Sequence, residues 1–225
     1  MKKISKILSA VFSPLIVPCY GIAMSLCVTP LFVIPFKTRA MVLGMCAIFL
    51  FLLPALSVMG LYRMGIIKDV GLNNRNERTV PYLVTMACYG MCAYYLYRIN
   101  APFWLVGFIV GGLLTILVNL LVNLRWKISG HMAALGGWLG VTFFIALNHL
   151  AVINMMWIVI VIVILAGVVG TARLILERHT PMQLLAGTAN GFLSIYLCAW
   201  LLSMAQILPA SAKLGNKFKE LGDRG

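Results

Sequence analysis

The sequence predicts an all-α protein: a polytopic membrane helix bundle with six or seven transmembrane helices. Of the 225 residues, 62% are hydrophobic and only 10% are charged. Soluble domains average about 45–50% apolar and about 25% charged residues. The apolar residues also gather in long runs, and one membrane span needs about 20 of them. The length therefore fits a single membrane-embedded domain over residues 1–225, with no room for a separate soluble domain.

Seven apolar runs mark the expected spans. They lie at roughly 8–34, 40–62, 82–98, 102–124, 129–147, 152–172 and 181–206. Prolines at 14, 18, 30 and 35 fall within or beside the first run, and because proline removes a backbone donor, we expect that run to be kinked or broken. Glycine pairs spaced four apart, at 107/111, 136/140 and 187/191, predict close packing of helices in lipid.

Three polar clusters interrupt the apolar sequence, at residues 63–81, 125–131 and 173–183. Two expected spans separate the first cluster from the second, and two separate the second from the third. Because an even number of crossings returns the chain to the same membrane face, all three clusters can meet there. We therefore expect one composite site, and the basic residues leave open which side of the membrane it faces, since several of them are candidate site residues.

The third cluster places charged and polar residues at the end of a span, where charge is costly and usually functional. Its order is Arg173, five residues, His179, three residues, Gln183. Thr180-Pro181 predicts a helix start. His179 should therefore lie just before the last span, with Gln183 within one helical turn of it.

The second cluster repeats this arrangement at the start of the fifth span, where Lys127, Ser129, Gly130 and His131 occur. Free N–H groups at a helix start attract anions. The net charge of +13 indicates either anionic lipid headgroups or phosphate-bearing substrates as partners. Nucleic acid is not expected, because the basic residues sit in short loops, and no acidic pair or histidine cluster predicts a metal.

At these residues the chain resembles the type-2 phosphatidic acid phosphatase family, which also includes the vanadium haloperoxidases. The resemblance covers roughly residues 63–190, and the family pattern has three parts. The third part is matched by Arg173, His179 and Gln183, although the family has Asp where this chain has Gln. The second part, Pro-Ser-Gly-His, is matched by Ile128-Ser129-Gly130-His131, which lacks the proline. The first part, Lys–six residues–Arg-Pro, is matched in spacing by Lys68 and Arg75, although Asn76 follows in place of the proline. Arg78, three residues before Pro81, is an alternative for that arginine.

The resemblance implies a role for each matched residue. His179 would attack phosphorus and carry a phosphohistidine, His131 would protonate the leaving group, and Gln183 would orient the His179 ring without the charge of an aspartate. The phosphoryl oxygens would be held by Arg173, Lys68 and either Arg75 or Arg78, with further donors from Ser129 and Gly130. Lys127 is a further candidate for substrate binding, because it lies close to Ser129 and His131 in the sequence. The resemblance also implies an activity that is independent of metal, and we expect no cofactor.

We therefore expect a metal-independent phosphatase that hydrolyses a lipid phosphomonoester or a polyprenyl diphosphate, as a multi-pass protein of a bacterial inner (plasma) membrane. The glutamine at 183 supports an alternative, a weak or inactive relative that binds or moves anionic lipids. A transporter of small anions is a third hypothesis, which lacks broken-helix symmetry in its favour. The lipid and the oligomeric state stay open.

Overall fold

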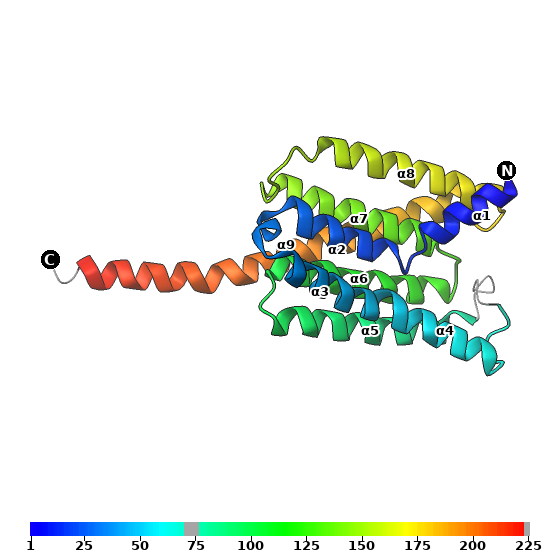
Figure 1. Ribbon diagram of the computed structural model, residues 1–225, viewed down its shortest axis with the longest axis horizontal. Coiled ribbons are helices and arrows are strands. Elements are labelled where there is room, and N and C mark those ends of the chain that lie inside the picture. The colour runs from blue at the N-terminus through cyan, green and yellow to red at the C-terminus, as the bar shows by residue number, and fades with distance from the viewer. Residues whose placement is uncertain (70–76, 223–225) are drawn as a thin grey trace.

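Helices account for all the regular secondary structure in the residues described. The computed structural model describes residues 1–69 and 77–222, with side chains up to residue 206. The elements are α1 (Lys2–Val11), α2 (Val17–Val28), a 3₁₀ turn (Pro30–Val33), α3 (Phe36–Ala47), a π-helical turn (Ile48–Leu52), α4 (Leu53–Arg63), α5 (Thr79–Arg98), α6 (Phe103–Asn123), α7 (Gly130–Leu147), α8 (Met156–Ile175) and α9 (Pro181–Gly222). The predicted all-α fold class is confirmed (Figure 1).

In the described part of the chain, five helical stretches are long and apolar enough to cross a membrane: Phe36–Arg63, α6, α7, α8 and Pro181–Gln206. Helix α5 has 20 residues, and α2 is a shorter apolar helix of 12 residues. With these two helices, the bundle is compatible with the six or seven crossings predicted from the sequence. The protein is an integral membrane protein, whose surface-exposed side chains include many large apolar ones, as a lipid-facing bundle requires.

The first predicted span is broken, as its prolines predict. Helix α1 ends at Val11 and α2 begins at Val17, with Pro14 in the connection and Pro18 in the first turn of α2. The helix boundary differs from the expected start at residue 8, because α1 already begins at Lys2. Helix α1 leaves the line of α2 and packs against α8 (Figure 1).

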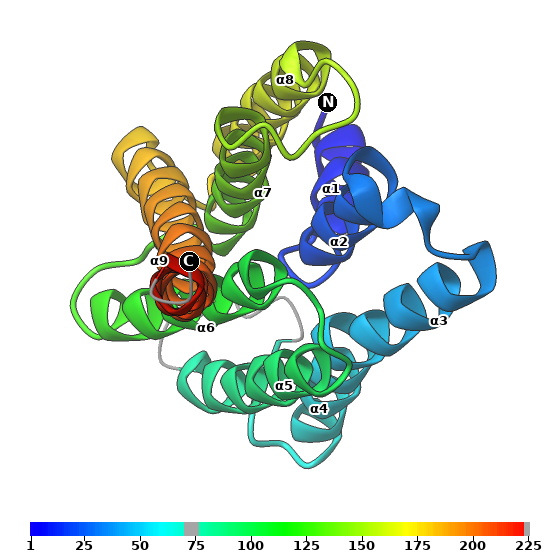
Figure 2. The same cartoon turned by 90° about the vertical axis from the view of Figure 1, so that its left-hand side faces the viewer.

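Helix α9 is the central packing element, in contact with both α6 and α7 (Figure 2). A Cβ atom added to Gly107 would lie 2.7 Å from the Ala199 Cα of α9, and one added to Gly111 would lie 2.6 Å from the Ile195 Cα. On α7, a Cβ at Gly140 would lie 2.7 Å from the carbonyl oxygen of Phe192. The predicted packing role of the glycine pairs is confirmed, since any larger residue would hold these helices apart.

The described residues of the three polar clusters lie at one end of the bundle. Figure 1 shows the end of α4, the start of α5 and the α6–α7 and α8–α9 connections at the same end, on the right, together with the N-terminus of α1. This is the arrangement that the even number of crossings predicts. The shared end places residues far apart in sequence close enough to form a single site.

Candidate phosphate site

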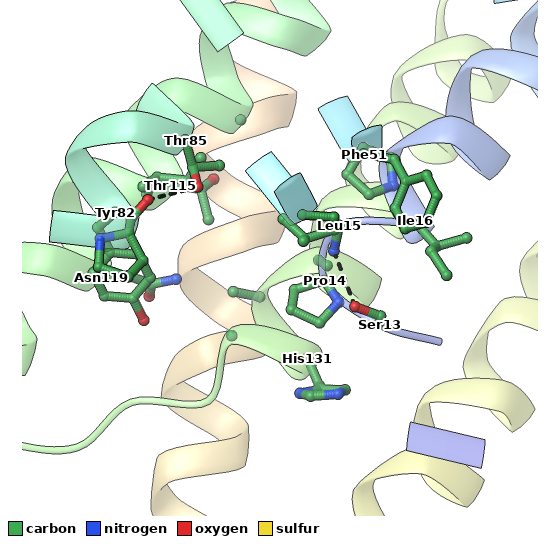
Figure 3. Close-up of a pocket in the computed structure, with 18 of the residues that line it drawn as sticks. Ser13, Pro14, Leu15, Ile16, Phe51, Tyr82, Thr85, Thr115, Asn119 and His131 are labelled. Carbon is green, nitrogen blue, oxygen red and sulfur yellow. Dashed lines mark hydrogen bonds between the residues drawn. The ribbon is translucent and has the colours of Figure 1, made fainter. Parts of the chain in front are cut away.

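A cavity of about 670 Å³ opens at this end of the bundle. Residues from all three polar clusters line it: Arg78 from the first, Gly130 and His131 from the second, and Arg173, Arg178 and His179 from the third. Figure 3 shows His131 below the Ser13–Ile16 connection, with Tyr82, Thr85, Thr115 and Asn119 of α5 and α6 farther along the cavity wall. The two histidines thus share one cavity with three arginines.

A tight turn between α8 and α9 places His179 in the cavity wall. Helix α8 ends with Glu177 in the left-handed conformation, at φ 54°, and the Arg178 N–H donates to the Arg173 carbonyl at 3.1 Å. This bonding pattern closes a helix C-terminus and reverses the chain. Helix α9 then begins at Pro181, so His179 is held between two helix ends with only 8% of its surface exposed.

Gln183 fixes the orientation of the His179 ring. Its Oε1 lies 3.2 Å from His179 Nδ1 and 3.2 Å from the Thr180 backbone nitrogen. Because a backbone N–H can only donate, the side-chain atom facing both groups is the carbonyl oxygen, and Nδ1 must carry a proton. The Nε2 atom of neutral His179 therefore keeps its lone pair, as a nucleophile requires.

The surroundings of His179 favour its neutral form. Burial and the positive charge of Arg173 together lower the pKa of the imidazole to about 3, although the hydrogen bond that His179 donates to Gln183 opposes this shift. Lys127 and Arg78 also lower this pKa. The histidine is therefore neutral at neutral pH, and adding positive charge to its ring is unfavourable until an anion enters the site.

The start of α7 is joined to the start of α9 through backbone atoms. Ser129 is the N-cap of α7, and its hydroxyl accepts a bond from the Met132 N–H at 3.4 Å. The Ser129 N–H donates to the carbonyl of Gln183 at 3.3 Å. Ser129 is fully buried, so its hydroxyl acts as a helix cap, while Gly130 and His131 line the cavity.

The cations around the cavity face one another. The Arg78 side chain is 8% exposed and donates to the Ile128 carbonyl at 3.4 Å. Burial lowers the pKa of Lys127, and the positive charges of Arg78, Arg178 and Arg173 lower it further. Within the described residues, the buried Arg173 Nε has no hydrogen-bond partner. A bound anion would reduce the repulsion between these cations and would accept a hydrogen bond from the unsatisfied Arg173 Nε.

Lys68, predicted for the first motif, does not join this cluster. The exposed Lys68 is not among the cavity-lining residues, and its backbone N–H donates to a carboxylate oxygen of Glu77 at 2.8 Å. Arg75 lies outside the described residues. Arg78, which the sequence left as an alternative for that arginine, lines the cavity.

Sequence reasoning missed two cavity cations, Lys6 and Arg178. Arg178 directly precedes His179 and could have been included from that position alone, whereas Lys6 resembles an ordinary lysine flanking a membrane span. No group of three or more His, Cys, Asp or Glu residues lies together in the described parts of the chain. Independence from metal stays a prediction to be tested with a chelator.

The fold and the cavity define an integral membrane protein with a cationic site at one end of its helix bundle. Residues 123–207 match the family model described as the PAP2 superfamily, which confirms the likeness to type-2 phosphatidic acid phosphatases predicted from the sequence. The matched segment contains His131, Arg173 and His179, and it supports a phosphatase-type function on a phosphate-bearing substrate. Among curated proteins and among solved structures, nothing matches the chain.

Proposed function

We propose that the protein is a metal-independent phosphatase of a bacterial inner (plasma) membrane, which hydrolyses a lipid phosphomonoester or a polyprenyl diphosphate through a phosphohistidine. The observation that carries the proposal is a single cavity with two kinds of lining. At one end it has two histidines and several cations, and it continues between apolar helices. This combination suits a substrate with an anionic head and a hydrocarbon tail.

The apolar part of the cavity extends away from the charged end along α5 and α6. On α5 the lining residues Arg78, Tyr82, Thr85 and Tyr89 follow one face of the helix into the bundle. Opposite them lie apolar side chains of α4, α6 and the π-helical turn, which include Phe51, Val58, Met59, Phe108, Ile109 and Ile116. A lipid tail could remain in this apolar space while its phosphate reaches the histidines.

The proposed reaction has two displacement steps at phosphorus. The Nε2 lone pair of His179 forms a bond to phosphorus as the bond from phosphorus to the leaving oxygen breaks, and that oxygen takes a proton from His131. His131 Nε2 lies 3.0 Å from the Ser9 carbonyl oxygen and donates to it, so His131 acts as an imidazolium whose second proton, on Nδ1, is the one transferred. His131 then takes a proton from water, whose oxygen displaces His179 and forms inorganic phosphate.

The cations bind the transferred group during both steps. A phosphoryl transition state carries negative charge on its three equatorial oxygens, and catalysis depends mainly on positioning and charge stabilisation. Arg173, Arg78 and Arg178 supply such donors around the cavity. Lys127 adds a further positive charge near the site: it lowers the pKa of His179, and its own pKa is lowered by the arginines.

Gln183 favours one alternative, a weak or inactive relative that binds or moves anionic lipids. A neutral amide accepts from His179 Nδ1 but adds no negative charge to stabilise a phosphohistidine. Charge-assisted hydrogen bonds are roughly twice as strong as neutral ones. A binder would retain the cation cluster and the cavity while releasing no phosphate.

Phosphate release from a panel of lipid phosphates distinguishes these functions. We expect purified protein in detergent to release inorganic phosphate from phosphatidic acid or a polyprenyl diphosphate in the presence of EDTA, and faster than from soluble p-nitrophenyl phosphate. The preference follows from the apolar part of the cavity. Lipid binding without release from any member of the panel would establish the binder instead, and loss of activity with EDTA would reject independence from metal.

Replacing Gln183 with glutamate should move the acidic limb of the pH profile. The glutamate side chain has the same length as glutamine and is negatively charged. It should therefore raise the low pKa of His179 by about one to two units. Because His179 must be unprotonated to attack, activity is lost as pH falls through this pKa, and the acidic limb of kcat/KM should shift to higher pH. An unchanged limb in Gln183→Glu, compared with wild type on the same lipid, would contradict the contact between these side chains.

A further inference from the structure

Helix α1 forms part of the cavity wall beside the two histidines. Lys6, Ser9 and Ala10 all line the cavity. The carbonyl of Ser9 is outside the hydrogen-bond pattern of the helix, because the Ser13 N–H bonds instead to the Ala10 carbonyl at 3.2 Å. The Ser9 carbonyl accepts from His131 Nε2 at 3.0 Å. The chain before the first long span therefore touches a residue of the proposed reaction.

The side chain of Ser9 is a buried donor at this wall. Its relative exposure is 9%, and its hydroxyl oxygen has no hydrogen-bond partner within the described part of the chain. An unpaired buried hydroxyl costs free energy that a bound acceptor would recover. Arg173 Nε, also on a cavity-lining residue, is in the same condition. Two helices that pack against each other, α1 and α8, thus each bring a residue with an unsatisfied donor to the cavity wall.

Lys6 adds positive charge on the same side of α1. It precedes Ser9 by three residues, which places both side chains on neighbouring positions of one helical face. The opposite face is apolar and exposed, through Ile4, Ile7 and Val11. This pattern directs the polar face of α1 toward the bundle and its apolar face toward lipid.

We propose that α1 is part of the phosphate site, in which the Ser9 hydroxyl donates to a phosphoryl oxygen and Lys6 supplies the cation that the sequence motif assigned to Lys68. The inference rests on the proposed function for its substrate. It adds two binding residues from a helix that lies outside the segment matched to the PAP2 superfamily. A negatively charged phosphate can bind both residues, because it forms an ion pair with the Lys6 ammonium and its oxygens accept a hydrogen bond from the Ser9 hydroxyl.

Orthovanadate, a stable mimic of phosphate, tests the inference without any turnover. Its binding to the purified full-length protein in detergent is measured by calorimetry, and its inhibition of lipid-phosphate hydrolysis is measured in parallel. Because Ser9→Ala removes a hydrogen bond to a charged group, it should bind orthovanadate about tenfold more weakly than the wild type does. The more exposed Lys6 predicts about threefold weaker binding in Lys6→Ala, smaller at high salt and restored in Lys6→Arg.

Two residues of the same helix provide matched controls. Ser5 is also buried, but its hydroxyl donates to the Met1 carbonyl at 3.2 Å, and it does not line the cavity. Lys2 lies one turn before Lys6 on the same face and is likewise not a cavity residue. Ser5→Ala and Lys2→Ala should bind orthovanadate as wild type does. Alanine is a strong helix former, so none of these variants should unfold α1.

The results separate this inference from the proposed function. Weaker binding in Ser9→Ala and Lys6→Ala than in their controls supports the role of α1, even if the wild type releases no phosphate and is a binder. Equal binding in all four variants overturns the role of α1, even if the wild type is an active phosphatase. A wild-type protein that neither binds orthovanadate nor releases phosphate overturns both.

Discussion

The variant His179→Asn is expected to lose phosphate release by roughly three orders of magnitude or more, the scale seen when a nucleophile is removed. Asparagine keeps a polar side chain of similar size in the turn, but it has no imidazole nitrogen to attack phosphorus. The measurement is the rate of phosphate release from the best lipid of the panel. Incorporation of labelled phosphate into the protein should disappear in the same variant, since the covalent intermediate cannot form.

His149 offers a matched control for this experiment. It is exposed, lies in the connection between α7 and α8, and has a φ of 52°, a conformation that asparagine tolerates well. His149→Asn should therefore be as active as the wild type. Retention of more than about one tenth of the activity in His179→Asn would reject the nucleophile, because removal of a nucleophile costs far more than tenfold.

The second large effect is expected from Gly191→Ala, and it concerns stability. A Cβ atom on Gly191 of α9 would overlap the carbonyl oxygen of Ala133 on α7. The obstacle is backbone and cannot rotate away, so α7 and α9 must move apart. We expect a loss of about 3 kcal/mol or more in the free energy of unfolding, the upper range for overpacked interiors. Thermal unfolding in detergent, followed by circular dichroism, measures this loss.

The control for this variant is Gly167→Ala in α8. Nothing lies within 4 Å of a Cβ added to Gly167, and alanine is favoured over glycine in helices by about 1 kcal/mol. Gly167→Ala should therefore be as stable as the wild type or more so. Similar unfolding temperatures for the two variants would show that α7 and α9 are not packed as closely as described.

Much of the fold could be predicted from the sequence, because lipid imposes simple rules. Long apolar runs must become helices, prolines break them, and an even number of crossings returns the chain to one face. These rules located the spans, the break near Pro14 and the shared end of the polar clusters. The glycine pairs were equally informative, because their spacing places them on one helix face.

The features of the site that could not be predicted depend on tertiary contacts, which leave no pattern in the neighbouring sequence. Lys6 and Ser9 reach the cavity only because α1 turns aside from α2 and packs on α8. Glu177 occupies a left-handed position that glycine usually fills, so the turn before His179 could not be recognised from its residue type. Lys68 fits a motif by spacing alone, and spacing does not determine where a loop residue points.

The hydrogen bond between the Ser129 N–H and the Gln183 carbonyl connects the starts of α7 and α9 through main-chain atoms, independently of the side chains that line the cavity. Main-chain atoms, together with the close approach of Gly187 to Ser129, hold the two histidine-bearing helix starts in register. Side chains that face the cavity can therefore be exchanged without moving the scaffold that presents them. The same scaffold could accept different anionic headgroups through changes at a few cavity positions, which makes it a suitable starting point for redesigning substrate selectivity.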